Sequence, residues 1–251
     1  MDLARQFERD GYALARGVFG PGQLSKMESD FDRIVGAMLA SGEEINARWG
    51  GGQMDALDGG NSVVLHTHNV QQYSAVWLQA LLEPAFLDLA EQLLGPDIVL
   101  HHTKLFQKPP EEGAPFPMHQ DWSYFPTLHD TMLAAVIHVS RADDAMGCLR
   151  VVPGSHRLGR LEDSSGLSPI REYTLEGAVP LEAEPGDVAF FHYLTIHGSK
   201  PNRSPHTRKT VLVQMHSGDD RVEDGVQHPN ERLALRGFNH HASRSTAGAL
   251  K

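Results

Sequence analysis

The stretch Met118-His119-Gln120-Asp121-Trp122 carries the strongest structural signal in the chain. Residues two apart on an extended strand point to the same side. His119 and Asp121 would therefore present an imidazole nitrogen and a carboxylate oxygen to one point. One more histidine would complete a 2-His-1-carboxylate triad, which holds Fe(II) on one face and leaves the other positions open. His197, which is followed by Gly-Ser, is our candidate for the third ligand.

Arg208 lies eleven residues beyond His197 and adds a second constraint. A His-x-Asp pair alone is a weak signal, because such pairs also occur on surfaces and in cores. A downstream His-Gly-Ser with an arginine eleven residues after its histidine adds a spacing constraint, and this makes a chance match rarer. The planar guanidinium of arginine suits a carboxylate. The sequence therefore predicts a metal site with an anionic ligand beside it.

The order of predicted elements indicates a mainly β protein with flanking helices. Helical patterns occupy 2–9, 23–38 and 84–94, and many short strands with turns between them follow from residue 98. This order favours an antiparallel barrel or jelly roll. We expect a single domain over 1–251, with a helical and loop part over 1–97, a barrel core over about 98–217 and a tail over 218–251 that has a weak helical trace at 230–235.

Several segments resemble the phytanoyl-CoA dioxygenase family, over roughly residues 3–217. They are Phe7–Phe19, His119-Gln-Asp121, Gly147-Cys-Leu149, Val152-Pro-Gly-Ser-His156, Pro185-Gly-Asp187 and His197-Gly-Ser199 to Arg208. That family contains Fe(II)- and 2-oxoglutarate-dependent oxygenases. The resemblance implies a double-stranded β-helix, a jelly roll of cupin-like form, with helices supporting one sheet.

The resemblance also implies the site and its cofactors. His119, Asp121 and His197 would bind Fe(II), and 2-oxoglutarate and O2 would take the open positions. We assign the distal carboxylate of 2-oxoglutarate to Arg208, with Ser199 as a hydroxyl donor and Thr210 as the alternative. Gln107 on the preceding strand is our further 2-oxoglutarate contact, with Lys104 as its alternative.

The expected activity is that of a dioxygenase which hydroxylates or otherwise oxidises a C–H bond of a small molecule or natural product, releasing succinate and CO2. Radical halogenases of similar fold leave the position of Asp121 to a small residue so that chloride can bind iron. The carboxylate present here favours oxidation over halogenation. An acyl-CoA substrate would need a basic patch for its phosphates, and the basic residues around Arg157, Arg160 and Arg171 are dispersed.

Two other functions stay open. A catalytically inactive, metal-binding family member could act as a binding module, and a zinc hydrolase could use the same three ligands. A buried arginine eleven residues after His197 has no purpose in a hydrolase. Succinate release that depends on added iron and 2-oxoglutarate separates the first function from both others.

Charge, cysteine content and apolar runs bear on the partners and the compartment of the protein. The net charge of -10 and the pI of about 5.8 argue against nucleic acid. Cys148 is the only cysteine, which suits a reducing compartment. Residues 1–5 lack the apolar run of a secretory signal, and no apolar segment is long enough to span a bilayer. We expect a cytoplasmic monomer or homodimer that acts on a small molecule and does not bind membranes.

We expect the substrate to be covered by residues 45–73, together with parts of 157–173. The first segment is glycine-rich and lacks periodicity, and long loops on a rigid barrel often select the substrate. The side chains expected to face the substrate are His66, Gln72, Tyr73, Trp122 and Phe125. His66 and His68 are interpreted as part of an active-site wall rather than as a ligand pair, and the other histidines outside the triad are interpreted as structural.

Overall fold

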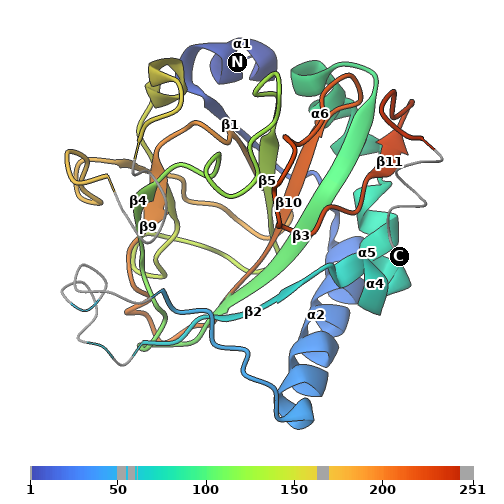
Figure 1. Ribbon diagram of the computed structural model, residues 1–251. Coiled ribbons are helices and arrows are strands. Elements are labelled where there is room, and N and C mark those ends of the chain that lie inside the picture. The colour runs from blue at the N-terminus through green and yellow to red at the C-terminus, as the bar shows by residue number, and fades with distance from the viewer. Residues whose placement is uncertain (1, 50–54, 56–59, 61, 163–169, 244–251) are drawn as a thin grey trace.

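The computed structural model describes residues 2–49, 55, 60, 62–162 and 170–243 (Figure 1). The helices are α1 (Leu3–Asp10), α2 (Pro21–Ser41), α4 (Val70–Tyr73), α5 (Ala75–Leu81), α6 (Pro84–Leu94) and a 3-10 turn η1 (Ser155–Leu158). The strands are β1 (Tyr12–Ala15), β2 (Leu65–His68), β3 (Ile98–Lys108), β4 (Phe116–His119), β5 (Leu133–His138), β6 (Leu149–Val151), β7 (Val179–Pro180), β8 (Val188–His192), β9 (His197–Ser199), β10 (Arg208–Ser217) and β11 (Leu233–Arg236).

Two antiparallel sheets face each other. The larger has the order β1-β8-β5-β10-β3-β11, with β2 also paired to β3, and the smaller has the order β4-β9-β6-β7. Strands distant in sequence alternate in both sheets, as in a jelly roll. The predicted fold, a mainly β double-stranded β-helix with flanking helices, is confirmed.

The pleat of the larger sheet separates a helix-covered face from an inner face. On β3, Thr103 and Leu105 point to the helices, and Leu105 belongs to the main hydrophobic core. His102, Lys104 and Phe106 point the other way, towards the smaller sheet, because successive side chains alternate. β10 follows the same alternation, since it pairs with β3 without a shift from Arg208 to Gln214.

The helices α2, α5 and α6 cover the outer face of the larger sheet (Figure 1). Their largest buried side chains are Phe31, Trp77 and Phe86, each fully buried. The ring of Phe86 stacks on that of Phe190 from β8, with 6.0 Å between the ring centroids. Burial of one such aromatic side chain contributes about 2 kcal/mol. The helices therefore bury the outer face of the larger sheet, and its inner face lines the cavity.

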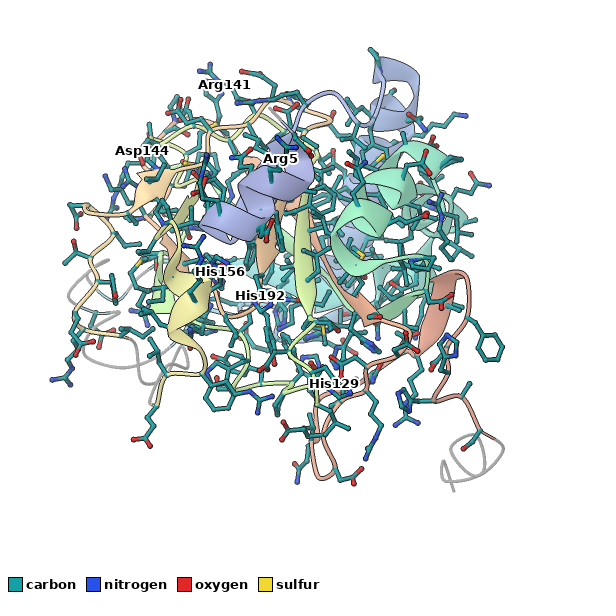
Figure 2. The ribbon with its side chains drawn as sticks, turned by 90° about the horizontal axis from the view of Figure 1, so that it is seen from above. Arg5, His129, Arg141, Asp144, His156 and His192 are labelled. Atoms are coloured by element: carbon teal, nitrogen blue, oxygen red, sulfur yellow. The ribbon has the colours of Figure 1, made fainter. Side chains whose placement is uncertain are left out.

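The helix ends follow local sequence rules where those rules apply. α6 begins at Pro84 and ends before Gly95, as the sequence predicts. α1 ends at Gly11, whose φ of 77° is unfavourable for residues with a side chain. A Cβ at Gly11 would also collide with the ring of His156. His156 and His192 lie under this end of α1 in Figure 2, with 5.9 Å between their ring centroids.

The structure corrects the expected tail and extends the sheet. The weak helical trace at 230–235 is wrong, because β11 forms there and pairs with β3. Strands β1 and β2, which come from the N-terminal part, also join the larger sheet. The alternation of Tyr12 and Leu14 predicts β1, whereas β2 and β11 form by pairing with the distant strand β3, which local periodicity does not report. Within the described residues, no helix is long and apolar enough to cross a membrane. The single-domain division stays a prediction.

Asp187 links the start of β8 to the segment after β1. Its carboxylate accepts hydrogen bonds from the Arg16 guanidinium at 2.6 Å and from the backbone N–H groups of Gly17 and Glu184, each at 2.8 Å. Burial raises the pKa of Asp187, but these donors outweigh it, and the net pKa is lowered. The ionised carboxylate therefore stabilises the folded state.

Asp187→Asn is expected to lower the free energy of unfolding by about 2 kcal/mol at neutral pH, because it removes charged hydrogen bonds. A folded pKa below the unfolded value gives stability that is lost as the pH falls, so the difference from wild type should shrink below about pH 4. Denaturant unfolding across pH measures this. Asp224→Asn, at a side chain 91% exposed, is the control and should change little. An equal loss at acidic and neutral pH would contradict the electrostatic account.

Candidate metal centre and its cavity

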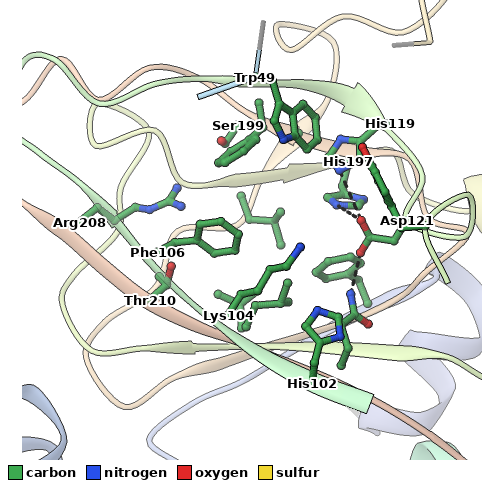
Figure 3. Close-up of a pocket in the computed structure, with 18 of the residues that line it drawn as sticks. Trp49, His102, Lys104, Phe106, His119, Asp121, His197, Ser199, Arg208 and Thr210 are labelled. Carbon is green, nitrogen blue, oxygen red and sulfur yellow. Dashed lines mark hydrogen bonds and ion pairs between the residues drawn. The ribbon is translucent and has the colours of Figure 1, made fainter. Parts of the chain in front are cut away.

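His119, Asp121 and His197 meet on the inner side of the smaller sheet (Figure 3). His119 ends β4, and it lies opposite His197 of β9 in the strand register. The Asp121 Oδ1 atom is 3.4 Å from His119 Nε2 and 3.6 Å from His197 Nε2. All three side chains are buried. Asp121 lies in the bend after β4 rather than on the strand, so the turn brings it to His119.

Hydrogen bonds on the far side of each ring fix the donor atoms. His119 Nδ1 donates to the Pro117 carbonyl at 2.8 Å, and His197 Nδ1 donates to the Thr195 carbonyl at 2.9 Å. A carbonyl can only accept, so each Nδ1 carries the proton and each Nε2 keeps a lone pair. Gln214 Nε2 donates to Asp121 Oδ2 at 2.8 Å, which leaves Oδ1 turned to the two rings.

The protonation states suit a cation. Burial and the nearby His119 together lower the pKa of His197 to about 4. Burial raises the pKa of Asp121, but His197 and His119 outweigh it and bring that pKa to about 2. Near neutral pH the His197 ring is neutral and the Asp121 carboxylate is ionised. Two imidazole nitrogens and one carboxylate oxygen on one side of a cavity fit a three-ligand metal site with open positions.

The cavity between the two sheets extends from the triad to Arg208. Its volume is about 900 Å³, counting the open mouth. The large sheet contributes the inner faces of β3, β5, β8 and β10, and the small sheet contributes β4, β6 and β9. Its lining residues are Trp49, His102, Lys104, Phe106, Phe116, His119, Asp121, Tyr124, Phe125, Val136, His138, Leu149, Phe191, His197, Gly198, Ser199, Arg208, Thr210, Leu212 and Gln214.

Two buried basic side chains lie at the end of the cavity away from the triad, and Arg208 is the one that lines it. Arg208 and Lys108 lie directly across from each other on β10 and β3. Lys108 Nζ donates to Ser199 Oγ at 2.6 Å and to the Lys200 carbonyl at 2.8 Å. Arg208 donates to the Gly147 carbonyl, and its Nε has no hydrogen-bond partner. Burial lowers the pKa of Arg208 to about 10.

Burial and the nearby Arg208 charge lower the pKa of Lys108 well below its ordinary value, so Arg208 carries the charge at this end of the cavity. Neither side chain has a carboxylate partner among the described residues. Burial of an unpaired charge costs several kcal/mol, so proteins normally pair such charges. A guanidinium with a free Nε–H, next to a hydroxyl that a buried lysine side chain holds in place, is the donor set expected for a bound carboxylate. This end of the cavity is therefore built for an anion.

Comparison with known proteins agrees with this arrangement. The sequence matches the family described as phytanoyl-CoA dioxygenase (PhyH) over residues 7–210. The chain belongs to the phytanoyl-CoA dioxygenase family. As a member, it is a dioxygenase that depends on iron and 2-oxoglutarate, so the predicted enzyme class and the predicted cofactors, Fe(II), 2-oxoglutarate and O2, are confirmed.

Named relatives of this dioxygenase include enzymes with different substrates. A probable phytanoyl-CoA dioxygenase of Caenorhabditis elegans is 28% identical over 86% of this chain and 74% of its own length. A probable alpha-ketoglutarate-dependent hypophosphite dioxygenase of Stutzerimonas stutzeri is also 28% identical, over 86% of this chain and 78% of its own length. The solved epimerase SnoN, in complex with Fe3+, alpha ketoglutarate and nogalamycin RO, matches 94% of this chain and 95% of its own with a TM-score of 0.72 and 24% identity, which shows a shared fold.

The structure brings together most of the residues predicted to bind 2-oxoglutarate in this dioxygenase. Arg208, Ser199 and Thr210 all line the cavity. Gln107 does not, and we correct that assignment. It lies opposite Lys209, whose ammonium bonds to Glu28 and Asp32 on α2, so Gln107 is on the helix-covered face. The alternative, Lys104, is on the inner face and points into the cavity (Figure 3).

Of the residues predicted to face the substrate, only Phe125 lines the cavity. His66 stacks on the Phe106 ring beside it, with 6.1 Å between the centroids. Trp122 packs against the hydrophobic cluster that contains Phe125. The Arg160 guanidinium lies 5.3 Å from the centroid of the Trp122 ring. Gln72 bonds to Glu231 at 3.0 Å, and Tyr73 is 55% exposed. The short helix α4 directs these last two side chains to the surface.

The predicted cover lies partly outside the described residues, which omit 50–54, 56–59, 61 and 163–169. From its described part, Trp49 lines the cavity, and its ring centroid is 4.8 Å from that of His119. The sequence did not single out Trp49, Lys108 or Gln214. The two polar residues had a usable signal, because Lys108 is four residues from Lys104 and Gln214 is six from Arg208, which are same-face spacings on a strand.

Gln214→Leu is expected to weaken Fe(II) affinity about 10- to 100-fold, because it removes the donor that orients the metal-facing carboxylate. Fe(II) or Mn(II) binding measured by calorimetry tests this without turnover. Thr103→Val, on the opposite face of the neighbouring strand, is the matched control and should retain wild-type affinity. Unchanged metal affinity in a folded Gln214→Leu protein would show that Asp121 needs no such support.

Proposed function

We propose that this dioxygenase oxidises a C–H bond of a small molecule, with Fe(II) held by His119, Asp121 and His197 and with release of succinate and CO2. The observation that carries the proposal is the pairing of two features in one cavity. Two imidazoles and a carboxylate stand at one end, and a buried guanidinium without a carboxylate partner, that of Arg208, stands at the other. A keto acid that binds a metal through one end needs a cation at its other end.

Each residue has a separate task. Nε2 of His119, Nε2 of His197 and Oδ1 of Asp121 would hold the iron, while Gln214 holds the carboxylate in place. Arg208 would bind the distal carboxylate of 2-oxoglutarate, and Lys108 keeps the Ser199 hydroxyl next to it. When bound, iron and 2-oxoglutarate supply the oxidising chemistry, with O2 as the oxidant. Trp49 and Phe125 line the cavity with aromatic surface and exclude water from it.

A small substrate with an acidic group fits this cavity best. The Lys104 side chain enters it from the same face as His102, and no residue of the described chain forms a salt bridge with its ammonium. Burial lowers the pKa of Lys104, and Asp121 raises it. Relatives are named for phytanoyl-CoA, hypophosphite, L-proline and ectoine, all of which carry acidic groups. L-proline trans-4-hydroxylase of Streptomyces griseoviridis supports hydroxylation as the reaction.

The alternative of an inactive binding module is not favoured, because the donor set and the anion site are both intact. A zinc hydrolase would leave the buried Arg208 and Lys108 without a ligand. A cytoplasmic location and a monomeric or homodimeric state stay predictions from the sequence.

The proposed function requires that 2-oxoglutarate be converted to succinate only when Fe(II) and O2 are supplied. His119→Ala should lower this turnover at least about 100-fold, because a metal ligand is lost. His206→Ala, at an exposed histidine, should leave it unchanged. Mass spectrometry of succinate, with and without candidate acidic substrates, measures both. Wild-type turnover in a metal-loaded His119→Ala protein would remove the triad from the mechanism.

Arg208→Met is expected to raise the KM for 2-oxoglutarate by about 100-fold or more, because a charge-assisted bidentate contact contributes about 3 kcal/mol. Arg208→Lys should recover only part of this, since an ammonium cannot form the planar fork. The exposed Arg141, marked in Figure 2, supplies the control Arg141→Met. A KM for 2-oxoglutarate that does not change in Arg208→Met would place the distal carboxylate elsewhere.

A further inference from the structure

A second group of histidines lies next to the cavity and outside the triad. His68 comes from β2, His102 from β3, and His228 from the segment before β11. One ring nitrogen of each lies within 4.8 Å of the other two. The ring centroids of His102 and His228 are 4.4 Å apart, and those of His68 and His228 are 5.6 Å apart. Three segments that are far apart in sequence therefore bring imidazoles to one point.

Two of these three rings have a buried nitrogen without a hydrogen-bond partner. His68 Nε2 and His102 Nε2 are buried and form no hydrogen bond, and the His102 residue is fully buried. His228 Nδ1 donates to the Pro229 carbonyl at 2.9 Å, so its Nε2 keeps a lone pair. A buried polar atom without a partner costs about 1 to 3 kcal/mol. Such atoms gathered at one point indicate a missing ligand.

The surroundings keep these imidazoles neutral. Burial, with a smaller contribution from the nearby Lys104, lowers the pKa of His68 to about 3. Burial also lowers the pKa of His102 well below its ordinary value. The rings are therefore not imidazolium ions that wait for an anion. Neutral imidazole is the form that binds a metal.

The orientation of the His102 ring is also fixed by a hydrogen bond at its Nδ1 atom. Its Nδ1 is 2.6 Å from Nδ1 of His101, so one proton lies between these two atoms. Phe125 packs against both rings, at 5.3 Å from His102 and 5.0 Å from His101 between centroids. A ring nitrogen that is hydrogen-bonded behind and shielded by an aromatic side chain has the support usual for metal-binding histidines.

We propose that His68, His102 and His228 form a second metal site, which binds Zn2+. Three neutral imidazoles with an open fourth position are a known zinc ligand set. Nitrogens around a tetrahedral zinc ion are about 3.3 Å apart, so the three rings must close slightly from the present arrangement. His68 and His228 are only partly buried, and their rings have room to do so.

This site is distinct from the triad but adjoins it. His102 lies opposite Gln214 in the β3–β10 register, and Gln214 bonds to Asp121 (Figure 3). A metal here would tie β2 and the segment before β11 to the wall of the cavity, since His102 also lines the cavity. The Lys104 ammonium opposes a second cation at this position, so its removal should tighten zinc binding.

The test uses tag-free protein in which His119→Ala and Asp121→Ala disable the triad. Equilibrium dialysis against about 1 µM free Zn2+, followed by metal analysis, should find about one zinc ion per chain. Adding His228→Ala should abolish this binding, and Lys104→Met should strengthen it several-fold. His129→Ala, at an exposed histidine on the periphery in Figure 2, is the matched control and should retain the ion.

Thermal unfolding gives an independent measurement, because a ligand that binds only the folded state raises Tm. Zn2+ should raise the Tm of the triad-disabled protein, and it should not do so once His228→Ala is added. If the triad-disabled protein does not fold, the count on otherwise wild-type protein should fall from two ions to one with His228→Ala. Zinc uptake that is absent, or that is indifferent to His228→Ala and weakened by Lys104→Met, would overturn the proposal.

Discussion

The antiparallel pairing of β3 with β10 is the constraint on which the rest of the structure depends. Its register sets Lys108 opposite Arg208, Phe106 opposite Thr210 and His102 opposite Gln214. The strand pleat then sends all six side chains to the inner face. The intervening residues, such as Leu105 and Val211, pack under the helices. A slip of one residue would exchange the core for the site, so the hydrophobic packing outside fixes the chemistry inside.

This pairing helps to place groups of opposite charge at the two ends of the cavity. The ionised Asp121 and two imidazoles stand at one end, while the buried Arg208 guanidinium stands at the other without a carboxylate partner. Unpaired buried charge opposes folding, so the hydrophobic core on the outer face must offset that cost. The same charge separation suits a ligand with two different ends, one that binds a metal and one that binds a cation. The buried charge that suits ligand binding therefore lowers the stability of the same sheet.

The sequence predicted those parts of the site that local patterns specify. His119, Asp121, His197 and Arg208 belong to short motifs whose spacing is visible, and the jelly roll follows from the run of strands. Gln107 was wrong because alternation tells which residues share a face but not which face is inside. Strands β2 and β11 were missed because distant pairing with β3 creates them. The convergence of His68 with His228 has no local signal either.

In the proposed complex, one cavity holds both a metal at the triad and a keto acid that reaches Arg208. The most direct measurement is a crystal structure of the protein grown without oxygen, with Fe(II) and 2-oxoglutarate. It should show iron about 2.1 Å from His119 Nε2, His197 Nε2 and Asp121 Oδ1, with the distal carboxylate of 2-oxoglutarate hydrogen-bonded to Arg208. Iron bound away from these three atoms, or a carboxylate that does not contact Arg208, would contradict the account.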